Sequence, residues 1–328
     1  MKKIELIDFL RGFAIFTIIL MHLLQGFQIP SVINKALSFG GVGVHVFFLC
    51  SGFGLYLSYL KRPLGYLEFL KKRFLKIYWP YFICVLLWGI WLFVSQGEFQ
   101  FTNVLSHIFL YKMFGHDLDV SICNHYWFIS TIIQFYFCWP LIVSLMNKKY
   151  GFQISVGISL LWSAIVGVLG FEDYRPWGSC FLQYLWEFCF GMLLARKLYV
   201  NEIKDIFDSK KWSWIWLFSI FFICMILTGT MGWLGGVLKL YNDIPSLFAY
   251  LSMALIVYKF SFEYINKTFI WTNTFSYELY LVHSLVYALI IYSLSSVLPS
   301  YIIIPICIVS VFALAYLYEK LLRKTRLK

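Results

Sequence analysis

Long apolar stretches recur along the chain, and each is followed by a short polar connection. A stretch of about 20 apolar residues is long enough to cross the roughly 30 Å hydrocarbon core of a bilayer as a helix. The pattern therefore predicts an all-α protein, a polytopic transmembrane helical bundle with about ten spans. The predicted spans are residues 6–27, 40–60, 74–95, 126–146, 151–170, 179–195, 212–232, 244–260, 272–294 and 298–318.

The composition excludes an ordinary soluble domain. Of the 328 residues, 61% are hydrophobic and 13% are charged, and the mean hydropathy is +0.77, whereas soluble domains carry about 25% charged residues. The eight cysteines show no CxxC spacing, which argues against a cysteine-ligated zinc site, and no metal site is predicted. Because no sizeable soluble module interrupts the spans, we expect residues 1–328 to form a single membrane domain.

The formal net charge of +11 is distributed in a way that sets the orientation in the membrane. If the N-terminus is cytoplasmic, the inside segments hold 23 of the 27 Lys and Arg residues. The positive-inside rule then places both termini in the cytoplasm. We expect a multi-pass protein of the plasma membrane whose basic clusters contact anionic membrane lipids, and no nucleic acid. The outside loops keep only Lys35, Lys112, Arg175 and Lys239.

The first predicted span contains the stretch "RGFAIFTIILMH", with Arg11 and His22 at its ends. On a helix these residues differ by only about 20° in direction and are separated by about 16 Å along the axis. A cation near the inner surface suits a phosphate-bearing ligand, and a deep imidazole suits proton transfer. Each residue also has a structural interpretation, as a snorkelling anchor or a hydrogen-bonded core histidine.

Three further charged residues lie at the depth of Arg11. Asp8 precedes Arg11 at the i,i+3 spacing at which an acid can hold an arginine in place, although a surface ion pair is an equal alternative. Arg73 and Lys76 have the same spacing at the next cytoplasmic boundary. This arrangement suits a polyphosphate ligand that docks from inside, but the positive-inside bias alone would also place cations there.

Other polar and aromatic side chains within the predicted spans are candidates for substrate binding. Groups that form hydrogen bonds at membrane depth usually face the interior of a helical bundle. A packing role is slightly favoured for the serine and is an equal alternative for His283. The candidates are Ser51, His45, Gln134, Tyr136, Glu187, Tyr280 and His283.

Six motifs follow one another from residue 8 to residue 283: "DFLRGFAIFTIILMH", "FFLCSGF", "RFLKIYWP", "WFISTIIQFYFCWPL", "FGMLLA" and "SYELYLVH". Together they resemble the signature of the integral-membrane acyltransferase 3 family. The resemblance implies a ten-helix enzyme that moves an acyl group, usually acetyl, from cytoplasmic acyl-CoA to a hydroxyl of a surface glycan, a lipid-linked glycan or another extracytoplasmic acceptor.

By the same resemblance, Arg11 would contact the CoA phosphates, His22 would act at the acyl group, and Arg73 would belong to a paired-arginine motif. Acyl-CoA would be a donor substrate, with no permanently bound cofactor. The sequence departs from the family twice. Lys76 replaces the second arginine of the pair and lacks its bidentate geometry, and Ile132 replaces an acid that many members carry, which puts a catalytic carboxylate there in doubt.

The family resemblance also bears on the acceptor side of the reaction. Some relatives carry a fused periplasmic esterase-like module, and we expect none here, because the spans occupy nearly all of the sequence. We therefore expect the acceptor to be acylated by the membrane domain alone or through a separate extracytoplasmic transfer protein.

Two other classes of function fit part of the pattern. A proton-coupled transporter or flippase of a glycan precursor would also use buried His and Glu side chains, although we find no pair of repeated halves with broken helices. The second alternative is a non-catalytic scaffold for a glycan synthase. Arg11→Ala should weaken CoA binding if the protein is the enzyme, whereas a scaffold should keep its phenotype in His22→Ala.

Overall fold

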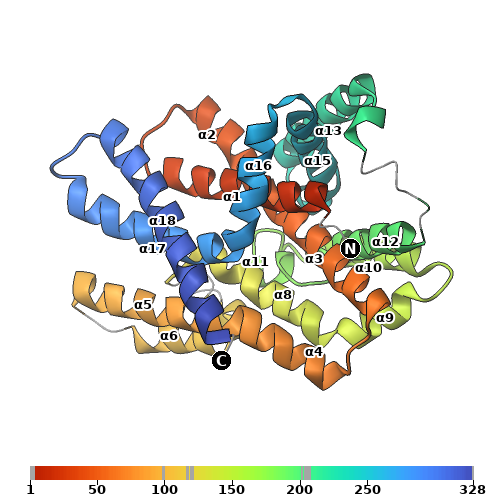
Figure 1. Ribbon diagram of the computed structural model, residues 1–328, viewed down its shortest axis with the longest axis horizontal. Helices are drawn as coiled ribbons and strands as arrows, with labels where there is room; N and C mark the ends of the chain where they lie inside the picture. Colours follow the sequence, from red (N-terminus) through yellow and green to blue (C-terminus); the bar gives the residue numbers. More distant parts are fainter. Residues whose placement is uncertain are drawn as a thin grey trace. The chain divides into compact units, whose positions relative to one another are not determined.

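A computed structural model describes residues 4–97, 100–115, 118, 122–200, 202 and 208–326. Every regular element among these residues is helical and no strand occurs among them (Figure 1). The predicted all-α class is therefore confirmed. The chain folds into two compact units, each made of segments that are distant in the sequence. A single membrane domain over residues 1–328 remains a prediction.

The first unit comprises Met1–Gly43, Leu75–Val104 and Phe262–Lys328. Its central helix is α1, which contacts α2, α16, α17 and α18. Helix α6 (Phe101–Ile108) begins in this unit, and the π-helix η2 (Phe74–Tyr78) leads into α5. The unit contains α1 (Glu5–Leu24), α2 (Ser31–Ser38), η1 (Phe39–Val42), α5 (Trp79–Gln96), α16 (Glu263–Thr272), η7 (Asn273–Phe275), α17 (Ser276–Leu294) and α18 (Ser300–Arg326).

Helices α1 and α16 approach one another closely at Gly12. A Cβ atom at this position would lie 1.8 Å from the backbone oxygen of Phe269, so only glycine fits. Around this contact the rings of Phe9 and Phe13 meet the Phe269 ring edge-on, with centroids 5.4 and 5.3 Å apart. Such edge-to-face pairs add to the attraction that comes from apolar burial. The contact fixes α1, which carries Arg11 and His22, against its neighbour.

Tyrosine hydroxyls connect the other helices of this unit. Tyr277 and Tyr287 of α17 donate to the carbonyl oxygens of Ile77 (2.6 Å) and Ile19 (3.3 Å). Tyr318 of α18 donates to the carbonyl oxygen of Pro80 at 2.8 Å. Because a hydroxyl that is buried among helices needs a partner, these bonds fix the neighbouring helices in register.

The second unit comprises Val44–Phe74 and Leu105–Ser261. Figure 1 shows α13 and α15 side by side within it, and these two helices share an extensive contact. It contains α3 (Gly43–Lys61), α4 (Tyr66–Arg73), η3 (Tyr111–Phe114), η4 (Asn124–Tyr126), α8 (Trp127–Phe137), α9 (Trp139–Met146), α10 (Gly151–Val168), α11 (Arg175–Gly178), α12 (Leu185–Tyr199), η6 (Ser209–Lys211), α13 (Trp214–Leu234), α14 (Val237–Tyr241) and α15 (Asp243–Phe260).

Helices α3 and α12 pack together through two glycines. A Cβ atom at Gly52 would lie 2.0 Å from the backbone oxygen of Phe188, and one at Gly191 would lie 1.9 Å from that of Leu49. Small residues at a helix interface let two backbones approach closely, which is how helices associate where lipid replaces water. The contact holds α3, which carries His45, next to α12, which carries Glu187.

The predicted span 126–146 is not a straight helix. Its two parts, Asn124–Phe137 and Trp139–Met146, meet at an angle of 64°. Pro140 lies in the first turn of α9, where its missing N–H and its ring interrupt the hydrogen bonds of a continuous helix. The sequence motif "CWP" therefore marks a bend.

Among the described residues, eight helical stretches are long and apolar enough to cross a membrane, and the bent pair α8 and α9 makes a possible ninth. Nine of the ten predicted spans correspond to these stretches. The tenth, 179–195, corresponds to α12, which has 15 residues and is shorter than the roughly 20 residues that cross a bilayer. The first residues of this predicted span form the turns that precede α12.

Candidate active site

Arg11 and His22 lie on one unbroken helix, because α1 runs without interruption from Glu5 to Leu24. Their spacing therefore gives the common face expected from helix geometry, with about 16 Å between them along the axis. Both side chains are partly buried within the first unit. The helix thus presents a guanidinium group and an imidazole group on one side, at two different heights.

His22 forms a hydrogen bond with a second histidine. Its Nδ1 atom lies 2.9 Å from Nε2 of His283 on α17, and the two rings are stacked with centroids 5.1 Å apart. His283 is fully buried. The sequence presents His22 and His283 as separate candidates, 261 residues apart, and the fold brings them into one pair.

The surroundings of His283 determine which nitrogen atoms carry hydrogen. Its Nδ1 atom lies 3.1 Å from the carbonyl oxygen of Leu279 and 2.8 Å from that of Tyr280. Carbonyl oxygens only accept, so His283 must donate from Nδ1, and in its neutral form Nε2 is then an acceptor. His22 must therefore donate from its own Nδ1, which leaves the basic lone pair of neutral His22 on Nε2.

Two tyrosines of α17 pack against His283. The ring centroids of Tyr280 and Tyr287 lie 6.2 and 5.9 Å from that of the histidine. The Tyr287 hydroxyl donates to the carbonyl oxygen of Ile19 on α1, so Tyr287 also joins the two helices that carry the histidines. Tyr280 is a sequence candidate for substrate binding, and here it supplies both a packing surface and a backbone acceptor for His283.

The cationic end of α1 is connected to the C-terminal segment. Asp8 accepts a hydrogen bond from the side-chain amide of Asn273 at 2.8 Å. Asn273 was not among the sequence candidates, because an asparagine between two helices gives no signal beyond that of a turn. The role of Asp8 in supporting Arg11 remains a prediction.

Lys76, the other candidate phosphate ligand of the first unit, has an exposed side chain.

Arg73 belongs to the second unit, where its guanidinium carbon lies 5.5 Å from the centroid of the Phe69 ring. The Phe69 ring in turn meets Tyr136 of α8 edge-on at 6.0 Å. A cation above an aromatic face is attracted by the ring. Arg73 is thus anchored at α4, and Tyr136 packs beneath that anchor.

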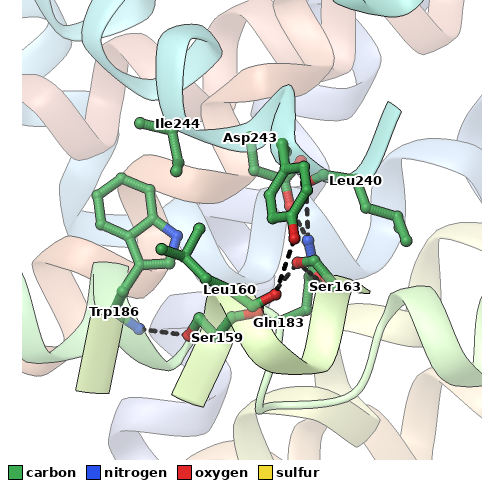
Figure 2. Close-up of a pocket in the computed structure, with 9 residues that line it drawn as sticks. Ser159, Leu160, Ser163, Gln183, Trp186, Leu240, Asp243 and Ile244 are labelled. Carbon is green, nitrogen blue, oxygen red and sulfur yellow. Dashed lines mark hydrogen bonds between the residues drawn. The ribbon is translucent and has the colours of Figure 1, made fainter. Parts of the chain in front are cut away.

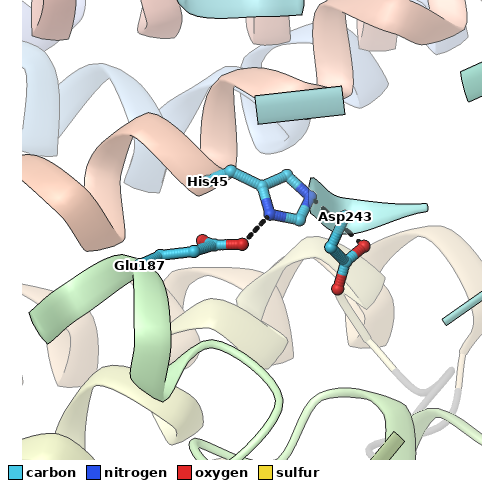
Figure 3. Close-up of side chains that lie close together, drawn as sticks. All are labelled: His45, Glu187 and Asp243. Carbon is cyan, nitrogen blue, oxygen red and sulfur yellow. Dashed lines mark hydrogen bonds and ion pairs between the residues drawn. The ribbon is translucent and has the colours of Figure 1, made fainter. Parts of the chain in front are cut away.

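A second polar cluster, His45, Glu187 and Asp243, lies within the second unit (Figure 3). Nδ1 of His45 lies 2.7 Å from Oε1 of Glu187, and Nε2 lies 3.7 Å from Oδ1 of Asp243. The sequence presents His45 and Glu187 as separate candidates and misses Asp243. As the first residue of α15, Asp243 has the sequence pattern of an ordinary acid at a helix N-terminus.

Asp243 also lines a small cavity (Figure 2). Gln183 donates to its Oδ2 atom at 2.8 Å and to the carbonyl oxygen of Leu240 at 2.9 Å. Ser163 donates to Oε1 of Gln183 at 2.9 Å. Gln183 is therefore a buried connection between α10 and α15, and it too was missed because it lies in the irregular turn before α12.

The remaining substrate-binding candidates have structural surroundings. Gln134 accepts a hydrogen bond at Oε1 from the backbone N–H of Phe181 at 3.2 Å. Ser51 is partly buried and adjoins the Gly52 contact between α3 and α12. The position of Ser51 agrees with its packing alternative, and the roles of both residues in binding remain predictions.

The apolar helices and a match to a protein family together place the chain in a family of integral-membrane acyltransferases. The sequence model of the acyltransferase 3 family, described as an acyltransferase domain, matches residues 4–320. The chain belongs to this family, as its six motifs predicted. The match covers segments of both units.

The chain is also similar to nodulation protein 10 of Rhizobium leguminosarum bv. viciae, with 24% identity over 236 residues. The aligned region is 63% of this chain and 63% of that protein, so it spans less than two thirds of the relative's length. No solved structure matches the chain.

Proposed function

We propose that the protein transfers an acyl group, acetyl in the first instance, from cytoplasmic acyl-CoA to a hydroxyl of a cell-surface or lipid-linked glycan, at the plasma membrane. Membership of the acyltransferase 3 family supports the class of reaction. The observation that carries the assignment of the reacting group is the hydrogen bond between His22 and His283. That bond gives neutral His22 a defined orientation and a basic lone pair on Nε2.

In the proposed reaction His22 is the general base. Nε2 of His22 accepts the proton of the acceptor hydroxyl while the hydroxyl oxygen attacks the thioester carbonyl carbon. A C–O bond forms, the C–S bond breaks, and protonated His22 returns the proton to the departing thiolate of CoA. Nδ1–H of His22 donates to His283 at every stage, so the pair accommodates both the neutral and the protonated form.

Arg11 supports the donor part of the proposal. Guanidinium groups bind phosphates through charge-assisted, often bidentate, hydrogen bonds. The distance of about 16 Å between Arg11 and His22 along α1 is comparable to the length of the pantetheine arm of CoA. Phosphates held at Arg11 would therefore let the thioester reach the imidazole. Lys76 would add a second cation. We also assign Arg73 to donor binding, because of its place in the family motif.

The rival functions make different predictions. A proton-coupled transporter also uses buried histidines and carboxylates, but the family match supports group transfer rather than transport. A scaffold would not depend on the imidazole of His22.

An intermediate with the acyl group on His22 is a variant of the same proposal. If the protein is recovered covalently acylated after incubation with the donor alone, this variant is favoured over the general base.

The decisive test compares surface glycans by mass spectrometry in cells that produce the wild type, His22→Ala or Gln25→Ala. Gln25 is an exposed residue at the end of the same helix and serves as the matched control. We expect His22→Ala to lose the ester-linked acyl group and Gln25→Ala to keep it, at equal amounts of protein in the membrane. Normal acylation by His22→Ala would rule out both catalytic roles.

A further inference from the structure

The cluster of His45, Glu187 and Asp243 brings together three polar side chains from three helices of the second unit. His45 comes from α3, Glu187 from α12 and Asp243 from α15 (Figure 3). One nitrogen or oxygen atom from each residue lies within 4.8 Å of those of the other two. The sequence predicts no metal site, because its metal-binding signals are short spacings and these three residues are far apart in the chain.

The cluster combines two carboxyl groups with one imidazole. When both carboxyl groups are ionised, its net charge is negative whether or not His45 is protonated. Glu187 is fully buried, and His45 and Asp243 are only 14% and 22% exposed. Among the ion pairs of the described residues, no Lys or Arg reaches either carboxylate. Buried charge of one sign is costly unless an opposite charge compensates it.

One carboxylate oxygen of Glu187 has no hydrogen-bond partner within the described part of the chain. Its Oε1 atom pairs with His45, but its Oε2 atom is buried and has no hydrogen-bond partner among the described residues. An unsatisfied buried acceptor costs about 1–3 kcal/mol, and more when it is charged. A cation held close to Glu187 would offset part of this cost.

The geometry of His45 suits a metal ligand. Glu187 holds Nδ1, so the imidazole is oriented with Nε2 toward Asp243. The separation of 3.7 Å between Nε2 and Oδ1 is longer than a hydrogen bond. It allows one ion to contact both atoms. Histidine ligands commonly donate their other nitrogen to a carboxylate in this way, which fixes the ring and raises its basicity.

Asp243 also lines a small cavity, whose wall includes neither His45 nor Glu187. The cavity beside Asp243 has a volume of about 10 Å³, which is the room that one water molecule needs and too little for a sugar. Gln183 holds the second oxygen of Asp243 in place at the wall of this cavity (Figure 2). The partial exposure of Asp243 provides a route for an ion.

We propose that His45 and Asp243 bind a divalent transition-metal ion of the Zn²⁺ type, with Glu187 as the positioning carboxylate. One imidazole nitrogen and a carboxylate oxygen are donors that Zn²⁺ accepts. The two carboxylates balance the charge of the ion when His45 is neutral. The proposal does not depend on the acyl-transfer reaction.

The test measures metal binding by the full-length protein in detergent, with any affinity tag removed and bound metal stripped by a chelator. Zn²⁺ is titrated against a chromophoric competitor, and Co²⁺ is used as a spectroscopic probe. We expect one ion per wild-type chain, and no binding by Asp243→Asn or by His45→Gln. We expect about 10- to 100-fold weaker binding by Glu187→Gln, the effect typical of a lost ligand-orienting carboxylate.

The matched control is Asp173→Asn, which removes an exposed carboxylate that pairs with Lys239 in the same unit. It should bind zinc as the wild type does. Thermal unfolding of the metal-free proteins shows whether each variant is folded, and His45→Gln provides an independent ligand variant if Asp243→Asn is not. The proposal is overturned if the wild type binds no more zinc than the double variant H45Q/D243N, or if all variants bind equally.

Discussion

Gly12 of α1 lies directly against the backbone oxygen of Phe269 on α16, so closely that a methyl group on Gly12 would lie 1.8 Å from that oxygen. The neighbouring residue, Arg11, is the proposed phosphate ligand, and His22 is on the same helix. The contact therefore sets the height and the rotation of the helix that carries both groups. A change at this point should disturb the site without altering any side chain in it.

We predict that Gly12→Ala destabilises the protein by about 1–3 kcal/mol, the usual effect of overpacking, because the backbone of α16 must move. The apparent melting temperature in detergent should fall by several degrees, and acyl transfer should fall with it. Gly157→Ala on α10 is the control, since a Cβ atom there meets nothing within 4 Å. Alanine is also the better helix former, so this control should be at least as stable as the wild type.

A second prediction concerns His283 as a positioning residue. In His283→Leu, His22 loses the acceptor that holds its tautomer, and a hydrogen bond to a group that becomes charged is worth about 1.5–3 kcal/mol. We therefore expect kcat to fall by about 10- to 150-fold while KM for acyl-CoA stays the same.

The control for this prediction is His283→Gln, because the glutamine side-chain oxygen also accepts a hydrogen bond. This variant should recover part of the activity. If His283→Gln and His283→Leu lose equal activity, or if KM rises as much as kcat falls, His283 serves packing rather than orientation. Steady-state kinetics on purified protein distinguishes these outcomes.

The arrangement of α1 could be predicted from the sequence because helical periodicity is a local property. An unbroken apolar run of this length forms one helix, and the spacing of Arg11 and His22 then fixes their common face. The bend at Pro140 was also encoded locally, by a proline within the predicted span 126–146.

The partners of these residues could not be predicted, since they depend on tertiary contacts. His22 and His283 are 261 residues apart, and nothing in either neighbourhood specifies the other. Asp243 was missed for a related reason: an acid at the start of a helix has an ordinary explanation until the fold places it beside a histidine. The sequence identified groups with unusual chemistry, and the fold determined which of them meet.

A third prediction concerns donor binding. Arg11→Ala should raise KM for acyl-CoA by about 10- to 150-fold, because one charge-assisted hydrogen-bonding group contributes about 1.5–3 kcal/mol. At saturating donor kcat should change much less. Arg323→Ala is the control, since Arg323 is an exposed arginine of α18 that pairs with Glu319. A lower kcat with an unchanged KM in Arg11→Ala would contradict a role in phosphate binding.

The final prediction uses the departure of this chain from its family at Lys76. Arginine binds phosphate through a planar fork, whereas lysine acts as a point charge. Lys76 is exposed at η2, so an arginine can be introduced there without burying a new group. If Lys76 contacts the donor, Lys76→Arg adds about one hydrogen bond, worth about 0.5–1.5 kcal/mol, and KM for acyl-CoA should fall by about 2- to 10-fold.

Lys267→Arg on α16 provides the control for this gain, because Lys267 is exposed and pairs with Glu263. It adds the same guanidinium group to the surface, so any general effect of arginine on CoA binding appears in both variants. Titration of purified protein with CoA measures the two affinities directly. An affinity of Lys76→Arg equal to that of Lys267→Arg would mean that Lys76 does not contact the phosphates, and that its charge serves membrane orientation alone.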